Sequence, residues 1–461
     1  MLTQTIASRV LDHALAQGAD FADIFVERQL RQSVRTVLDQ VEDVQSGLEF
    51  GIGIRLVYGQ QVLYGYTNRD DFDSLCRLIS TLAARDRRDP VVTAVPLDFR
   101  EFTSRHPVQM SLHQDALLGA KIDYLRRADQ AARAELEAIS RTIGSVLQRE
   151  QQIQIFDSEG LATADTRHYC RVSLTAVALD GQEQATGSDN RGGLVGWEVH
   201  QAAEPEVIGR EAARQALVNL GAKPCPSGHM PVVIGNGFGG VIFHEACGHL
   251  LETTSVARQA SVFHDKMGEM IASPVVSAVD DGTIKNAWGS LNIDDEGMPT
   301  ERTQLIKDGR LTSFLVDRLG SQATGYARTG SGRRESYRFA PASRMRNTFI
   351  EGGADRFEDM IASIDRGLFA ASMGGGSVQP GTGEFNFAVT EGYWVEHGKI
   401  QYPVKAATLI STGPDVLQSI SMVGEDLALA CGMCGSVSGS IPTTVGQPAL
   451  KVDNILVGGN A

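Results

Sequence analysis

The chain has 461 residues, which is too long for one ordinary hydrophobic core, so we expect two or three domains. The formal net charge is −14, because 56 aspartate and glutamate residues face 42 lysines and arginines. This acidic balance argues against sequence-independent binding of nucleic acid, which relies on a basic face. No apolar run reaches the roughly 18 residues that a membrane-spanning helix needs, so we expect no membrane partner either.

The first segment, "MLTQTIASRVLDHALAQGAD", lacks the basic lead and the unbroken apolar core of a signal peptide. Its apolar residues recur at helical spacing up to Gly18, so it predicts an amphipathic helix. We therefore expect a cytoplasmic protein. In that compartment the six cysteines are thiols or metal ligands and not disulfides.

Three units are predicted along the chain. Residues 1–90 form an N-terminal α+β unit, in which strand-like segments lie between two helices. Residues 91–222 form a second α+β unit of helix, hairpin and helix, with the hairpin turning at "DSEG". Residues 223–461 are mostly strand-like, with hairpins turning at "KDG" and "EHG". The predicted fold class is α+β: N-terminal α/β-type units with mixed sheets, then a β-rich C-terminal domain carrying one glycine-led helix.

That helix begins in the stretch "GNGFGGVIFHEACGHLLE", whose first half contains Gly235, Gly237 and Gly240 in a G-x-G-x-x-G pattern. A dinucleotide site would also need a second buried strand ending in an acidic residue about 20 positions further on. Asp265 is the nearest later acid, and it lies in no strand pattern. We therefore interpret the glycines as the start of a helix that packs tightly on its neighbours.

The second half of the stretch carries His244, Glu245 and His249. In the familiar H-E-x-x-H zinc helix the two histidines are four residues apart and face the same way. Five residues of regular helix leave the side chains about 140° apart. A π-bulge, or a bend at Gly248, would restore a common face. We therefore predict an irregular helix between Ala246 and His249.

His244, Glu245 and His249 lie in a run of small and apolar residues, which predicts that they are buried. A buried glutamate without a partner is costly, and a metal-bound water would give Glu245 a partner. The run therefore predicts a metal site. A catalytic zinc needs three protein ligands and one open position. Spacing leaves five candidates for the third ligand: Glu252, His264, Cys247, Cys431 and Cys434. "CGMC" is a single C-x-x-C, whereas a structural zinc site would want a second pair and a redox site a βαβ context. We favour one of its two cysteines.

Several longer blocks carry a family resemblance: "HEACGHLLE", "RRESY" with "RMRNTFIEGG", "GEMIASPVVSAVDDGT", "GADFADIFVE" and "CGSVSGSIPTTVGQPALKVDNILVGG". They extend over nearly the whole chain, which resembles the TldD/PmbA (TldE) zinc metalloprotease family, and within it the TldD subunit. One departure is "CGSVSGSIP", where close TldD relatives have "CGKDGQSVP". This departure puts in doubt a general need for that lysine and aspartate.

The resemblance implies a Zn²⁺ ion bound by His244, His249 and Cys434, with Glu245 as the catalytic base. It also implies a dimer that encloses the active site, formed with a PmbA/TldE-like subunit or with a second copy of the chain. The PmbA-type subunits lack the metal motif, so its presence indicates the catalytic type. The family acts on small or unfolded peptides.

The predicted activity is hydrolysis of peptide bonds by a metal-activated water, with Glu245 as general base. Candidates for stabilising the oxyanion are Tyr337, Arg344 and Arg346. Glycines expose backbone groups to which an extended peptide could add as a strand. The candidate substrate-binding residues of this kind are Gly374, Gly375, Gly376 and Ser377.

Two alternatives remain open at this point. One is a non-catalytic peptide-binding or partner subunit that retains a structural zinc, for which a closed four-ligand site including Cys431 would be evidence. The other is a dinucleotide-dependent oxidoreductase, which would have to bind nicotinamide or flavin.

Overall fold

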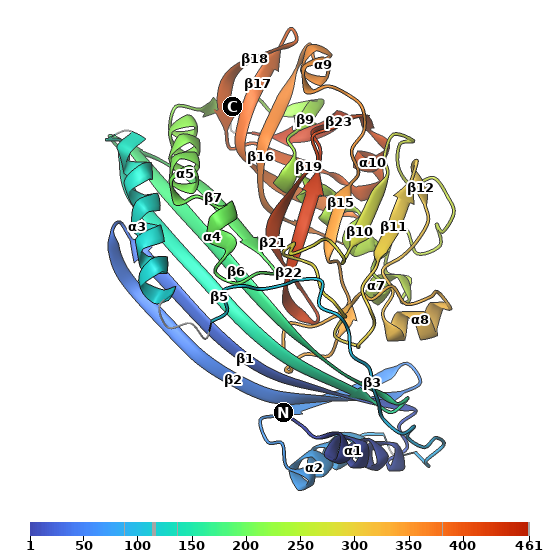
Figure 1. Ribbon diagram of the computed structural model, residues 1–461. Coiled ribbons are helices and arrows are strands. Elements are labelled where there is room, and N and C mark those ends of the chain that lie inside the picture. Colours follow the sequence, from blue (N-terminus) through green and yellow to red (C-terminus); the bar gives the residue numbers. More distant parts are fainter. Residues whose placement is uncertain (87, 113–116, 136, 380, 460–461) are drawn as a thin grey trace.

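A computed structural model describes residues 1–86, 88–112, 117–135, 137–379 and 381–459 (Figure 1). It confirms the predicted α+β class. Long, curved strands of the N-terminal half form one sheet, and the β-rich C-terminal half lies against the concave side of that sheet (Figure 1). Within the described ranges, no helix is both long and apolar enough to cross a membrane.

The N-terminal sheet has the order β3-β2-β1-β5-β6, with β4 and β7 both beside β6. Its strands are β1 (Phe21–Val37), β2 (Gln40–Tyr58), β3 (Gln61–Thr67), β4 (Asp98–Phe99), β5 (Ile139–Asp157), β6 (Leu161–Asp180) and β7 (Glu183–Gly193). The hairpin between β5 and β6 turns at residues 158–160, as predicted. Strands from the first two predicted units thus share one sheet, and the predicted limits at 90 and 222 stay predictions.

Five helices of the N-terminal half pack against this sheet: α1 (Gln4–Ala16), α2 (Phe72–Ala83), α3 (Leu117–Glu135), α4 (Val199–Ala202) and α5 (Pro205–Leu220). Both faces of the sheet are packed, because alternate side chains of each strand point to opposite faces. Ile24 and Val26 of β1 pack in one core with α1 and α2. Phe25 packs on the other side, in a cluster that includes Ile293 and Tyr337 of the C-terminal half.

The C-terminal half contains two larger sheets. In the first, pairing of β16 with β17 closes five strands into a ring. The ring strands are β9 (Gly228–Ile234), β16 (Arg366–Val378), β17 (Glu384–Glu396), β19 (Thr408–Thr412) and β23 (Leu450–Gly458), with β8 (Lys223–Pro224), β18 (Lys399–Lys405) and β20 (Ile420–Val423) attached. The hairpin between β17 and β18 turns at His397 and Gly398, as predicted.

The second sheet has the order β12-β11-β10-β15-β22-β21, so β21 is an edge strand. Its strands are β10 (Ala278–Asp281), β11 (Arg302–Lys307), β12 (Arg310–Leu311), β15 (Asn347–Ile350), β21 (Ala428–Ser436) and β22 (Gly439–Gln447). A small separate sheet pairs β13 (Gly332–Arg333) with β14 (Ala342–Ser343).

Short helices join these strands: η1 (Gly237–Gly240), α6 (Val241–Ala246), η2 (Gly248–Leu251), α7 (Thr253–Val256), α8 (Arg318–Thr324), α9 (Phe357–Ala362) and α10 (Gly413–Gln418). The glycine-led helix and α9 follow the sequence prediction, whereas α8 and α10 are additional. α6 packs against the ring strands β16 and β17, against α10 and against β15 and β22 of the second sheet. The glycine-led helix is thus held between the two sheets.

Candidate metal centre

The glycines of the lead-in let the chain pass very close to its neighbours. A Cβ atom added at Gly235 would lie 2.5 Å from the carbonyl oxygen of Ala371, and one added at Gly240 would lie 2.4 Å from that of Gly446. Gly237 has a φ of +65°, a conformation that glycine adopts at little cost. These contacts confirm that the glycines start a tightly packed helix.

The helix is irregular where the histidine spacing predicts it. α6 ends at Ala246, Cys247 takes φ −132° and ψ −51°, and a 3₁₀ turn begins at Gly248. The irregularity is a break into a 3₁₀ turn, not a π-bulge. It brings His244 and His249 onto a common side, with ring centroids 5.0 Å apart.

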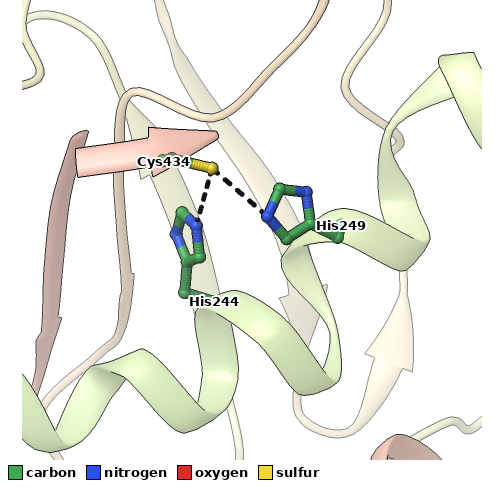
Figure 2. Close-up of side chains that lie close together, drawn as sticks. All are labelled: His244, His249 and Cys434. Carbon is green, nitrogen blue, oxygen red and sulfur yellow. Dashed lines mark hydrogen bonds between the residues drawn. The ribbon is translucent and has the colours of Figure 1, made fainter. Parts of the chain in front are cut away.

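Cys434 meets both histidines from the edge strand β21 (Figure 2). Its Sγ lies 3.2 Å from Nε2 of His244 and 3.2 Å from Nε2 of His249. The three donor atoms all lie within 4.8 Å of one another, so this His–His–Cys group could hold a metal ion. His244 and Cys434 are buried, while the side chain of His249 is 12% exposed.

The electrostatics of the group favour a thiolate. Burial alone would raise the pKa of Cys434, but the two imidazoles outweigh it and hold that pKa well below its ordinary value. Glu245 lies beside the group, with its Oε2 3.7 Å from Nε2 of His249. Burial raises the pKa of this carboxyl, although the two histidines partly offset the effect.

A second layer of contacts supports the group from behind. Oε2 of Glu252 lies 3.1 Å from Nδ1 of His249, the ring nitrogen that does not face Cys434. Nε of Arg344 lies 3.8 Å from Oε1 of Glu252, and the same guanidinium donates to the backbone carbonyl of Cys434. Arg344 therefore connects Glu252, which contacts His249, to the strand that carries Cys434.

The other candidates for a third ligand point elsewhere. Cys431 precedes Cys434 by three residues on β21, and its Sγ instead donates to the carbonyl of Gly192 at 3.2 Å. Burial raises the pKa of the Cys431 thiol to about 11. Cys247 lies in the apolar core, and Nδ1 of His264 is 2.8 Å from the carbonyl oxygen of Ser261.

Of the three residues predicted to stabilise an oxyanion, the structure brings only Arg344 to the group. Arg346 is fully buried and donates to Asp280, Thr303 and two backbone carbonyls. The hydroxyl of Tyr337 donates to Glu49 at 3.2 Å, against the N-terminal sheet. These contacts give Arg346 and Tyr337 structural roles, and a role of Tyr337, Arg344 or Arg346 in stabilising an oxyanion stays a prediction.

The predicted substrate-binding glycines lie in β16. The pairing of β16 with β17 shifts in register between Ala370 and Gly376. On the other edge, β9 pairs with residues 368–370 only, so the segment 371–378 has no strand partner there among the described residues. A Cβ atom at Gly375 would meet nothing within 4 Å. The edge that contains Gly374–Ser377 is therefore open.

A His–His–Cys group with a glutamate beside it is the arrangement of a metallopeptidase centre. Here the glutamate and both histidines come from one helix, which breaks between the two histidines. Three family models match the chain in order: PmbA/TldA metallopeptidase domain 1 over residues 22–85, the central domain over 114–220 and the C-terminal domain over 227–459. The chain belongs to this PmbA/TldD family of metallopeptidases.

Relatives match the sequence of this chain over nearly its full length. A protein of Haemophilus influenzae named "Metalloprotease TldD homolog" is 37% identical, over 99% of this chain and 96% of its own. A "Zinc metalloprotease TldD homolog" of Saccharolobus solfataricus is 24% identical, over 96% of this chain and 97% of its own. The crystal structure of TldE from Thermococcus kodakarensis has the same fold, with a TM-score of 0.77 and 19% identity over 98% of this chain and 100% of its own.

Proposed function

We propose that this chain is a zinc-dependent peptidase that hydrolyses peptide bonds of small or unfolded peptides. The observation that carries the proposal is the His–His–Cys group, whose donor atoms lie within 4.8 Å of one another with Glu245 beside them. Imidazole nitrogen and thiolate sulfur are ligands that zinc prefers, and three protein ligands leave one coordination position open. The printed name of the Saccharolobus solfataricus relative, a zinc metalloprotease, supports the choice of metal.

Each residue of the centre has a distinct task in this proposal. His244, His249 and Cys434 hold the ion, and Glu252 and Arg344 position two of these ligands. Zinc, when bound, supplies Lewis-acid chemistry, which acidifies water and polarises a peptide carbonyl. Glu245 accepts the proton of the attacking water at its carboxylate and delivers it to the leaving amine.

A purely structural zinc is the less favoured role. Such sites are closed by four protein ligands. In the part of the chain that the structure describes, no fourth histidine, cysteine or acidic residue completes the group, and Cys431 contacts Gly192 instead. The open position favours catalysis over a non-catalytic subunit.

The open edge at Gly374–Ser377 is the proposed docking site for the peptide. Added as a strand, a peptide is recognised through its backbone, which predicts loose sequence specificity. The turn that follows β16 lies next to the metal helix, since a Cβ atom at Gly383 would be 3.7 Å from a methyl group of Leu250. We propose a dimer with a PmbA/TldE-like subunit or with a second copy, and a cytoplasmic location stays a prediction.

The test is the Glu245→Gln variant, assayed alone and with a PmbA-type subunit. Mass spectrometry of a digested peptide pool should show cleavage by the wild type and its loss in the variant, while zinc content is unchanged. Glu358→Gln, at an exposed site on α9, is the matched control and should cleave normally. Unchanged cleavage by Glu245→Gln would overturn the assignment of the base.

A further inference from the structure

Three arginines gather on the concave face of the N-terminal sheet. Arg31 of β1 lies directly opposite Arg149 of β5 in the strand register, and Arg149 lies opposite Tyr169 of β6. Arg171 follows Tyr169 by two residues, so it shares the same face. Arg31 is exposed, whereas Arg149 and Arg171 are half-buried.

Among the described residues, none of these three arginines forms an ion pair, although the charge of Arg149 partly offsets the rise that burial causes in the pKa of the Glu27 carboxyl. Arg149 stacks over the ring of Tyr169 at 4.5 Å, and Arg171 donates to the side-chain oxygen of Asn190 at 3.1 Å. Burial lowers the pKa of Arg171. Like charges directly opposite each other on neighbouring strands are destabilising, so this arrangement needs a compensating anion.

Other arginines of the same face are paired. Arg167 forms a buried ion pair with Asp295 at 2.6 Å, and Arg35 an exposed one with Glu42 at 3.0 Å. In a chain with a net charge of −14, carboxylates are plentiful. The lack of an ion pair for Arg31, Arg149 and Arg171 among the described residues is therefore a specific feature of this part of the face.

Arg31 and Arg149 line a cavity of about 490 Å³ between the N-terminal sheet and the C-terminal half, and Arg171 lies over the ring of Trp288, another residue of the wall. Its walls include Arg31 and Arg149, the aromatic side chains of Tyr169, Trp288 and Phe339, and Met433. Met433 precedes the sulfur ligand Cys434 on the edge strand β21, and the indole N–H of Trp288 donates to the Gly432 carbonyl at 2.8 Å. The cavity thus adjoins the strand that carries the proposed metal ligand.

The carboxylates of the cavity wall already have partners. Glu49 forms an ion pair with Arg338 at 2.5 Å, and Glu335 accepts the backbone N–H of Ser440 at 2.6 Å. Neither is paired with Arg31 or Arg149. Among the described residues, the guanidinium groups of Arg31 and Arg149 thus enter no ion pair, and they lie beside aromatic surfaces of the cavity.

We propose that Arg31 and Arg149 bind the carboxylates of an acidic peptide segment, so that the enzyme prefers substrates rich in aspartate and glutamate. The inference rests on the proposed peptidase function, whose substrate class it specifies. Guanidinium groups form charge-assisted hydrogen bonds with carboxylates, and the aromatic walls accept the apolar parts of the peptide.

Binding is measured by fluorescence anisotropy on the zinc-loaded Glu245→Gln protein, so that no probe is cleaved. Three labelled peptides of equal length are compared, with acidic, neutral amide or basic residues at the same positions. The acidic peptide should bind at least about tenfold more tightly than the neutral one, and the preference should shrink as salt is raised. Adding Arg31→Gln and Arg149→Gln should abolish the preference.

Arg35→Gln is the matched control, because Arg35 lies on the same strand and face but has Glu42 as its partner. It should retain the full preference. Equal binding of acidic and neutral peptides, or equal loss in the control, would overturn the proposal. Tighter binding of a single-stranded oligonucleotide than of the acidic peptide would overturn it in favour of a nucleic-acid site.

Cleavage by the protein with intact Glu245 separates the two proposals. Cleavage of all three peptides with equal KM would contradict the acidic preference alone. Acidic preference in binding, with no cleavage by the zinc-loaded protein in either subunit arrangement, would contradict the peptidase function alone. For a cleaving enzyme, the double arginine variant should raise KM for the acidic peptide about tenfold and leave kcat unchanged.

Discussion

Glu252 contacts His249 on the side of the imidazole that faces away from Cys434. Its Oε2 lies 3.1 Å from Nδ1, while Nε2 of the same ring lies 3.2 Å from the cysteine sulfur. A carboxylate in this place holds the proton on Nδ1 and leaves the Nε2 lone pair for a metal. Nδ1 of His244, by contrast, is buried without a hydrogen-bond partner among the described residues. The two histidines are therefore not equally oriented by their surroundings.

Glu252→Gln is expected to lower zinc affinity by about tenfold or more, because an amide supports the Nδ1 proton of His249 less strongly than a carboxylate. Competition with a chromophoric chelator measures this affinity without any activity assay. Glu358→Gln, in which an exposed glutamate is changed, serves as the control and should bind zinc normally. Wild-type affinity in Glu252→Gln would show that Glu252 has no part in orienting the ligand.

The two cysteines of "CGMC" should behave differently. Cys434→Ser removes the sulfur that both histidines face, so zinc should no longer copurify with the protein. Cys431→Ser should keep its zinc, because the Cys431 thiol contacts Gly192 and not the histidines. Metal analysis of both purified proteins measures the difference. Loss of zinc from both variants would indicate a four-ligand site and favour the structural role.

Local patterns predicted most helices and hairpins. Periodicity identified α1, and the turn residues between β17 and β18 identified that hairpin. The pairing of β1 with β5 could not be predicted, because more than 100 residues separate the partners and nothing local specifies them. α8 and α10 are single short helices, each held by an N-cap side chain, Asp317 or Thr412, and too short to show an apolar period.

Some features of the metal centre could be predicted from local spacing, and others could not. The five-residue gap between His244 and His249 predicted the helix break, since a regular helix could not align the rings. Choosing Cys434 over Cys431 required the family resemblance, because spacing alone does not say which cysteine faces the histidines. The structural role of Arg346 could not be predicted, because its partner Asp280 lies 66 residues earlier in the chain and nothing local indicates that the two residues pair.

Gly240→Ala should destabilise the protein and disturb the metal helix. Its Cβ atom would lie 2.4 to 2.5 Å from three backbone atoms of Gly446, and overpacking of this kind costs about 1–3 kcal/mol. Gly119→Ala in α3 is the control, because its Cβ atom meets nothing within 4 Å and alanine stabilises a helix by up to about 1 kcal/mol. Urea unfolding should show a lower free energy of unfolding than the wild type for Gly240→Ala and a higher one for Gly119→Ala. Equal changes in the two variants would contradict the close packing of Gly240.

Asp317 should give the stability of the protein a specific pH dependence. Its carboxylate caps α8 by accepting from the Gly320 N–H, and it accepts from the Thr253 hydroxyl. Burial, together with the nearby negative charge of Glu296, raises the pKa of Asp317 from its ordinary 3.8 to about 6. The folded state therefore binds this proton more tightly than the unfolded chain does. The resulting stabilisation is complete below pH about 4 and is lost as the pH rises through about 6.

Asp317→Asn removes this titration while keeping a side-chain oxygen that can cap the helix. The free energy of unfolding of the wild type, minus that of the variant, should fall by up to about 3 kcal/mol between pH 4 and pH 7. Urea titrations of both proteins across this range measure the difference, in which the other titrating groups cancel. A constant difference would show that Asp317 has the same pKa in the folded and unfolded states and that its burial carries no electrostatic cost.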